Sequence, residues 1–179
     1  MSWALPFHSS ATRRRRAWHA RAAALLALCL ACLCCTAVAQ TCEVPQTLRS
    51  KPVQFADTCS GDTSISSICD GEVVLNGPVG IWRFRVGAGA NAVLELWDTG
   101  AGFSPVGFLV AANGACGGGD CHGYVDATTP LDLATVQPGD YHLIVTASEW
   151  DAAGSCGAYG LSLSGGLGGA DQVFADGFD

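Results

Sequence analysis

Apolar and polar positions alternate within short runs along the second half of the chain, and turn-forming residues separate these runs. Period-two alternation bounded by Gly, Pro, Asn and Asp is typical of β-strands, and no segment after Gln40 has a sustained helical repeat. The pattern therefore predicts an all-β fold, a single β-sandwich or jelly roll of about eight antiparallel strands. The predicted strands are Glu72–Leu75, Ile81–Val86, Ala92–Trp97, Val106–Ala111, Tyr124–Ala127, Leu131–Val136, Tyr141–Ala147 and Tyr159–Leu163.

Alternation also predicts which side chains face the core, because successive residues of a strand point to opposite faces. Arg83 and Arg85 share one face of their strand and must be solvated, which places Trp82, Phe84 and Val86 in the core. In the next strand Leu94 and Leu96 point inward, and Glu95 and Trp97 point outward. In Tyr141–Ala147 we expect Tyr141, Leu143 and Val145 on the core side and His142, Ile144 and Thr146 on the other side.

The first 39 residues have the organisation of a secretory signal peptide. A cluster of five arginines between Arg13 and Arg21 precedes the apolar run Ala22–Leu33, and Ala37-Val38-Ala39 supplies a small-x-small cleavage site. The apolar run is shorter than the roughly 20 residues that a membrane-spanning helix needs. An uncleaved anchor, a twin-arginine signal and a lipoprotein signal are the alternatives. We expect a secreted, periplasmic or outer-envelope protein, in contact with a membrane only through this segment if it is uncleaved.

Beyond Gln40 the chain is strongly acidic. Four basic residues (Arg49, Lys51, Arg83 and Arg85) stand against sixteen Asp and Glu, a net charge of −12. Nucleic-acid binding depends on clustered Lys and Arg, so this composition argues against a nucleic-acid partner.

Six cysteines remain after the signal region, and an even number in an exported chain predicts disulfides. A metal site is disfavoured because this region has no C-x-x-C and only two histidines. Six cysteines allow many pairings. The spacing favours Cys59–Cys69 and Cys116–Cys121, which leaves Cys42–Cys156.

Two segments resemble a known family. Gly139–Val145 and Gly157–Leu163 are similar to the closing hairpin of bacterial pre-peptidase C-terminal (PPC) domains, and Ile81–Val86 resembles an early strand of that family. The resemblance spans about Thr58–Ser164 and implies a secreted jelly-roll-like sandwich that aids secretion, stability or attachment. The family's paired-Asp signature is missing, since Asn113–Cys121 contains only Asp120, which argues against a family-type calcium site.

The domain boundaries follow from these features. Residues 1–39 are the predicted signal peptide and residues 40–164 the sandwich domain. Residues 165–179 are predicted to be a Gly-rich linker, Gly165–Gly169, and an acidic-aromatic tail. The tail resembles F-x-D-G-F-(D/E) termini of exported Gram-negative proteins.

No catalytic residues are predicted. The sequence contains no G-x-S-x-G motif, and we interpret His122 and His142 as surface or structurally satisfied histidines rather than bases. Scattered carboxylates in turns are ordinary turn chemistry. A hydrolase is therefore the third choice of function.

No cofactor is expected, with calcium as a possibility. Asp57, Asp62 and Asp70 fall in one segment that a Cys59–Cys69 bridge would gather, and hard cations prefer such oxygens. The alternative is a set of solvated acidic loops.

Exposed aromatics form the third kind of candidate site. Trp97, Trp150 and Tyr124 are candidate ligand contacts, since aromatic side chains stack on sugars or anchor protein contacts. Trp97 could instead be covered by a loop or pack beside Arg83 or Arg85. We therefore expect a non-catalytic exported module that attaches to a polysaccharide or protein surface, with a structural envelope or secretion-accessory role as the alternative.

Overall fold

The computed structural model describes residues 41–49, 53–100, 102–113, 116 and 118–169. The predicted signal peptide and its variants, and the tail residues 170–179, lie outside these ranges. Within the described part, no helix is long and apolar enough to cross a membrane.

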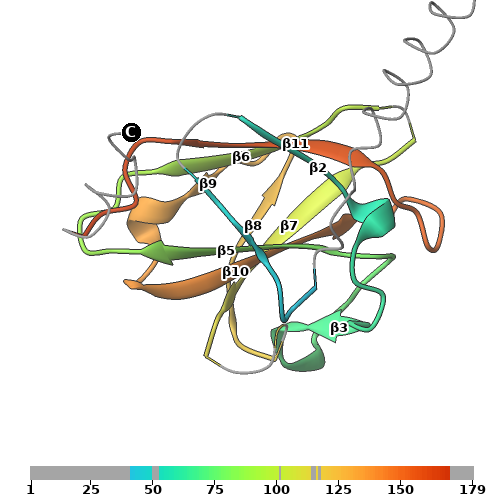
Figure 1. Cartoon of the computed structure of the whole chain (residues 1–179), viewed down its shortest axis with the longest axis horizontal. Helices are drawn as coiled ribbons and strands as arrows, with labels where there is room; N and C mark the ends of the chain where they lie inside the picture. The colour runs from blue at the N-terminus through green and yellow to red at the C-terminus, as the bar shows by residue number, and fades with distance from the viewer. Residues whose placement is uncertain (1–40, 50–52, 101, 114–115, 117, 170–179) are drawn as a thin grey trace, which may run out of the picture. The chain divides into compact units, whose positions relative to one another are not determined.

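Two β-sheets stack face to face, with a small hairpin outside them (Figure 1). The five-stranded sheet has the order β1-β5-β10-β7-β8 and the four-stranded sheet the order β2-β11-β6-β9. The all-β, disulfide-linked sandwich is thus confirmed. The five-stranded sheet contains β1 (Gln46–Thr47), β5 (Gly80–Val86), β7 (Pro105–Ala111), β8 (Cys121–Asp126) and β10 (Gly139–Ala147). The four-stranded sheet contains β2 (Gln54–Asp57), β6 (Val93–Asp98), β9 (Leu131–Asp132) and β11 (Ala158–Ser164).

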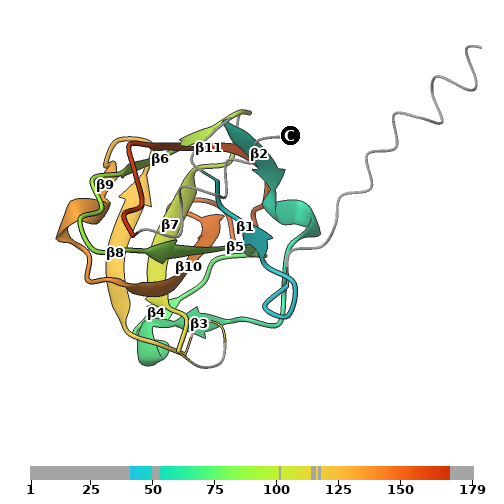
Figure 2. The same ribbon diagram turned by 60° about the vertical axis from the view of Figure 1, so that its left-hand side comes forward.

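The third element is the hairpin of β3 (Ser67–Ile68) and β4 (Val73–Val74), with the 3-10 turn η2 (Cys69–Gly71) between its strands. Each predicted run contains a strand, but β1, β2 and β3 are too short or too polar for the alternation to show. Pairing among these strands is antiparallel except for β1, which pairs with β5 in parallel. Figure 2 shows β1 beside one end of β5. Two further 3-10 turns are η1 (Thr58–Ser60) and η3 (Leu133–Thr135).

The predicted strand Leu131–Val136 is extended only at its start. The Asp132 carboxylate accepts a hydrogen bond from the Ala134 amide at 2.9 Å and so caps η3. A side chain that accepts a hydrogen bond from the backbone amide two residues later favours a turn over continued pairing between strands. Leu131 and Leu133 nevertheless both reach the core.

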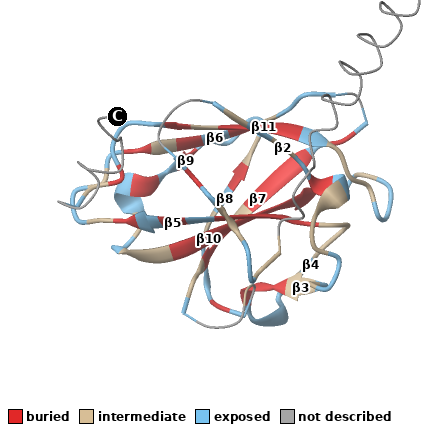
Figure 3. Cartoon of the chain, in the orientation of Figure 1, coloured by how far each residue is buried: buried red, intermediate tan, exposed pale blue. Residues whose placement is uncertain are grey.

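The main core lies between the two sheets (Figure 3). Trp82, Phe84 and Val86 are buried, as predicted, and so are Leu94 and Leu96. The indole Nε1 of Trp82 donates a buried hydrogen bond of 2.8 Å to the hydroxyl of Tyr159, which joins the two sheets. Burial of these polar atoms is therefore compensated.

The expected closing hairpin is wrong. β10 pairs with β5 and β7 in one sheet, whereas β11 pairs with β2 and β6 in the other. The connection between β10 and β11 therefore crosses from one sheet to the other.

All three disulfide pairings favoured by the spacing are also wrong. The bonds are Cys42–Cys116, Cys59–Cys156 and Cys69–Cys121, with sequence separations of 74, 97 and 52 residues. Cys59 and Cys156 continue the β2–β11 ladder, in which Asp57 is opposite Ala158. Extended strands carry sequence neighbours apart and bring distant segments together, so proximity along the chain is a poor guide to pairing here.

The Gly-rich segment Gly165–Gly169 is not a free linker, so the domain extends past residue 164. Leu167 is 3% exposed and belongs to the main core. Its carbonyl accepts from the Gly87 amide at 2.7 Å, and the Gly166 carbonyl accepts from the Asn91 amide at 2.9 Å. A Cβ at Gly168 would lie 2.7 Å from Ala88 O, and its φ is +74°. Glycine is required here for close backbone approach rather than for flexibility.

Candidate functional site

The hairpin β3–β4 packs on the outer face of the five-stranded sheet and forms a second, smaller core with it. Ile68 and Val79 meet Ile81, Val110 and Ile144 there. This layer explains why His142, Ile144 and Thr146 are buried although they point away from the main core. The disulfide Cys69–Cys121 attaches the hairpin region to β8.

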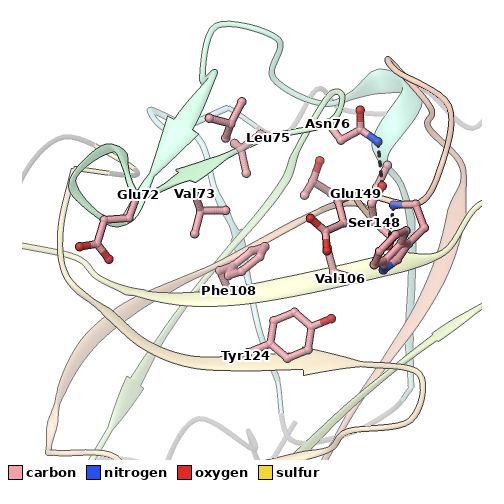
Figure 4. A pocket seen from close by; sticks show the side chains of 13 residues that line it. Glu72, Val73, Leu75, Asn76, Val106, Phe108, Tyr124, Ser148 and Glu149 are labelled. Carbon is pink, nitrogen blue, oxygen red and sulfur yellow. Dashed lines mark hydrogen bonds between the residues drawn. The ribbon is translucent and has the colours of Figure 1, made fainter.

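A groove of about 470 Å³ runs between this hairpin and the sheet (Figure 4). We name it the aromatic groove. One wall of the groove comes from β4 and the residues beside it. The floor comes from β7 and β8, and one end is closed by β10 and the turn that follows it. The lining residues are Glu72–Asn76, Val106, Phe108, Tyr124 and Thr146–Trp150.

Large apolar side chains are exposed along the groove. Trp150 is 88% exposed, Val74 79% and Tyr124 41%. Phe108 and Tyr124 are cross-strand neighbours, and their rings meet edge to face with centroids 5.5 Å apart. Side chains of this kind on one hollow are typical of a contact surface.

The turn that carries Trp150 is fixed by hydrogen bonds on both sides. The Asn76 side-chain amide donates to Ser148 O at 2.7 Å and to Asp151 O at 3.1 Å. The Asp151 carboxylate accepts from the Ser104 amide at 2.8 Å and from its hydroxyl at 3.1 Å. The exposed indole therefore projects from a backbone that is already ordered, which lowers the entropy lost on binding.

A second hollow of about 260 Å³ adjoins the groove, and the two share Val106, Tyr124, Ser148 and Trp150. Asp126 lines it and accepts hydrogen bonds from the Tyr124 hydroxyl at 2.9 Å and from the Thr128 and Thr129 amides. Slight burial opposes ionisation, but these donors outweigh it and hold the pKa of Asp126 at about 2.

Tyr124 shows the complementary shift. Burial raises the pKa of its hydroxyl to about 12, and the bond to Asp126 and the negative charges of Asp126 and Glu149 act in the same direction. The surface at neutral pH thus presents a neutral tyrosine beside ionised carboxylates.

Two of the three predicted ligand contacts come together here, and the third does not. Trp97 lies on the outer face of the other sheet, where its indole covers Gly160: a Cβ at Gly160 would be 2.4 Å from the ring. Phe55, 69% exposed, flanks Gly160 on the opposite side. The expected neighbourhood of Trp97 with Arg83 and Arg85 is wrong, because both arginines belong to β5 in the five-stranded sheet.

The three predicted calcium ligands have other roles. Asp57 caps η1 through the Cys59 amide at 2.7 Å, and Asp62 accepts from the Ser64 amide and hydroxyl. Asp70 lies in η2, and the Cys59–Cys69 bridge that would have gathered the three is not formed. Among the described residues, no three His, Cys, Asp or Glu side chains are grouped so as to hold a metal ion.

The two histidines lie apart from the groove lining. His142 is buried with Nδ1 3.8 Å from the Cys116 sulfur, and burial together with the charge of Arg83 lowers its pKa. His122 packs edge to face against Tyr141.

Sequence reasoning missed the hairpin wall of the groove. The sequence predicts a strand over Glu72–Leu75 and a turn from Asn76, and nothing in it indicates that these residues form one wall of a groove. An apolar side chain on the predicted solvent face of β10, Ile144, was the available signal that something covers that face.

No model of a known protein family matches the sequence, and no curated protein matches it. The resemblance to PPC domains therefore stays a prediction. Among solved structures, one similar to this chain is Aeromonas hydrophila PliG, a periplasmic lysozyme inhibitor of g-type lysozyme. The TM-score is 0.47 at 11% identity, over 68% of this chain and 96% of that one.

The Salmonella Typhimurium PliG, also a periplasmic inhibitor of g-type lysozyme, gives a TM-score of 0.38 at 10% identity, over 68% of this chain and 98% of that one. A likeness at this level carries no information on the partner of the present chain.

Proposed function

We propose that this chain is a non-catalytic, exported binding module that attaches to a partner protein through the aromatic groove. The observation that carries the proposal is Trp150, which is 88% exposed on a hydrogen-bonded turn and lines the same groove as Tyr124 and Val74. Trp and Tyr are enriched among the residues that dominate binding energy, above all where the backbone is ordered beforehand.

The three disulfides support the exported part of the proposal, since such bonds persist in oxidising compartments. They also fix the groove itself, because Cys69–Cys121 ties the hairpin wall to the strand that carries Tyr124.

The test is selection from a phage-displayed random peptide library on the immobilised wild-type protein. The affinity of the selected peptides is then measured for Trp150→Ala and for Phe55→Ala. Both side chains are largely exposed, so neither change removes a core residue. We expect Trp150→Ala to weaken binding by about tenfold or more and Phe55→Ala to leave it unchanged. Equal affinities for wild type and Trp150→Ala would refute the proposal.

Attachment to a polysaccharide is the second candidate, and the Phe55–Gly160–Trp97 row favours it. Gly160 leaves room for the Trp97 indole to pack against β11, with the Ser162 hydroxyl donating to the Glu95 carboxylate at 3.0 Å nearby. Flat aromatic rings beside polar groups are suited to sugar rings. Retention of the wild type on insoluble cellulose, chitin or peptidoglycan, lost in Trp97→Ala and kept in Trp150→Ala, would select this candidate instead.

A further inference from the structure

The aromatic groove is negatively charged. Glu72 and Glu149 line the groove itself, and Asp98 and Asp126 line the adjoining hollow. No Arg or Lys is present among the residues that line either hollow. A partner that enters here meets carboxylates without a compensating cation.

The basic residues of the described ranges lie elsewhere. Arg83 and Arg85 are on β5, and Arg85 forms an ion pair with Asp140 at 2.8 Å. Arg49 lies in the segment between β1 and β2. Charge balance for the groove carboxylates therefore does not come from the residues that line the two hollows.

Two of these carboxylates are available to a partner. Within the described ranges, the side-chain carboxylates of Glu72 and Glu149 form no hydrogen bond or ion pair, whereas that of Asp126 already accepts from Tyr124, Thr128 and Thr129. Glu72 lies at the Val73 end of the groove and Glu149 at the end next to Ser148 (Figure 4). A bound segment can thus meet a carboxylate at either end.

The shape of the site favours an extended occupant. The groove and the adjoining hollow share four lining residues, including Tyr124 and Trp150, so together they form one continuous depression. An extended polypeptide can follow such a depression with apolar side chains on the floor and charged ones toward the rim.

We propose that the partner contributes an extended segment with Arg or Lys side chains, whose cations pack on the rings of Tyr124 and Trp150 and pair with Glu149 and Glu72. This inference rests on the proposed function. Cation–π contacts and charge-assisted hydrogen bonds both favour such a segment, and complementary charge speeds the encounter.

The experiment uses the oxidised protein and end-blocked peptides of one design, Gly-Arg-Leu-Gly-Arg-Leu-Gly-Arg. In two control peptides citrulline, a neutral analogue of the same shape, or Glu replaces each Arg. Binding is followed by fluorescence anisotropy at low and high NaCl. The protein variants are Glu149→Gln, Glu72→Gln and, as a matched control on the other sheet, Glu95→Gln.

We expect the arginine peptide to bind most tightly and to lose affinity as salt rises. Each of Glu149→Gln and Glu72→Gln should weaken it by about 2- to 5-fold, as for partly exposed ion pairs, and Glu95→Gln should have no effect. N-acetyl-arginine amide should bind far more weakly than the peptide. Equal binding of this small cation and the peptide would overturn the extended-segment inference.

The failure of this inference differs from failure of the proposed function. If the citrulline or Glu peptide binds as tightly as the Arg peptide, while Trp150→Ala weakens the library-selected peptides by about tenfold or more, the groove is a binding site but not for a cationic segment. If the library selection yields no peptide that depends on Trp150, both fail.

Discussion

Replacing both members of the Cys59–Cys156 disulfide by Ala should destabilise the domain strongly. Cys59 follows β2 and Cys156 precedes β11, so the bond fastens an edge strand whose only sheet neighbour among the described strands is β11. Next to it the Thr58 amide donates to the Gly157 carbonyl at 3.0 Å. Without the disulfide, β2 is held by this short ladder, by the core contact of Ala56 and by a few side-chain hydrogen bonds, such as that from the Gly157 amide to the Thr58 hydroxyl at 3.1 Å.

The magnitude follows from the loop that the bond closes. A loop of 97 residues corresponds to about 4.7 kcal/mol of lost chain entropy in the unfolded state. With Cys69–Cys121 intact, the shortest covalent path between the two positions is about half as long, which reduces the expected loss to roughly 4 kcal/mol. For a urea m-value of about 2 kcal/mol per M, the midpoint should fall by about 2 M.

Urea unfolding followed by tryptophan fluorescence, without reductant, measures this shift. The matched control is Cys59→Ala with Cys69→Ala, the pair that the spacing suggested. Among the six cysteines of the described residues, the structure requires this control to leave two free thiols, Cys156 and Cys121, and requires Cys59→Ala/Cys156→Ala to leave none. A midpoint within about 0.5 M of wild type, or two titratable thiols in Cys59→Ala/Cys156→Ala, would refute the pairing.

Three further predictions concern other parts of the domain. Leu167→Ala should lower the free energy of unfolding by about 2–4 kcal/mol, measured by urea unfolding, and a neutral result would mean that the segment is a linker after all. Gly160→Ala should displace the Trp97 indole and change its fluorescence spectrum, and an unaltered spectrum would contradict the ring position. The depressed pKa of Asp126 stabilises the folded state above the unfolded value near pH 4, and this contribution disappears as the pH falls toward about 2. Asp126→Asn should therefore have a lower free energy of unfolding than wild type at pH 5, and the difference should shrink at pH 2. A difference that does not depend on pH would contradict the lowered pKa of Asp126.

The strands and their inward faces could be predicted from the sequence because both depend on neighbours two residues apart. Trp82 alternates with Phe84 and Val86 on one face of its strand, opposite the solvated Arg83. This pattern is local, and the burial of Trp82 confirms the prediction. The six cysteines likewise indicated disulfides before any pairing was known.

The candidate site was predictable only in fragments. Trp150 stood out as an aromatic residue in loop-like sequence and Tyr124 as one at the start of a predicted strand. They are 26 positions apart, however, and nothing local shows that they border one groove with Val74. From the sequence, Trp97 is as good a candidate for a ligand contact as Tyr124 and Trp150, but it lies on β6 in the four-stranded sheet.

What the amino-acid sequence determined by itself was the alternation that makes two-sided strands, the acidic charge and the presence of sulfur pairs. Only the tertiary structure decided which cysteines meet, that a hairpin covers the solvent face of β10, and that Leu167 folds back into the core. The reason is physical: alternation acts within a strand, whereas these contacts join segments far apart along the chain and depend on which sheet each strand enters.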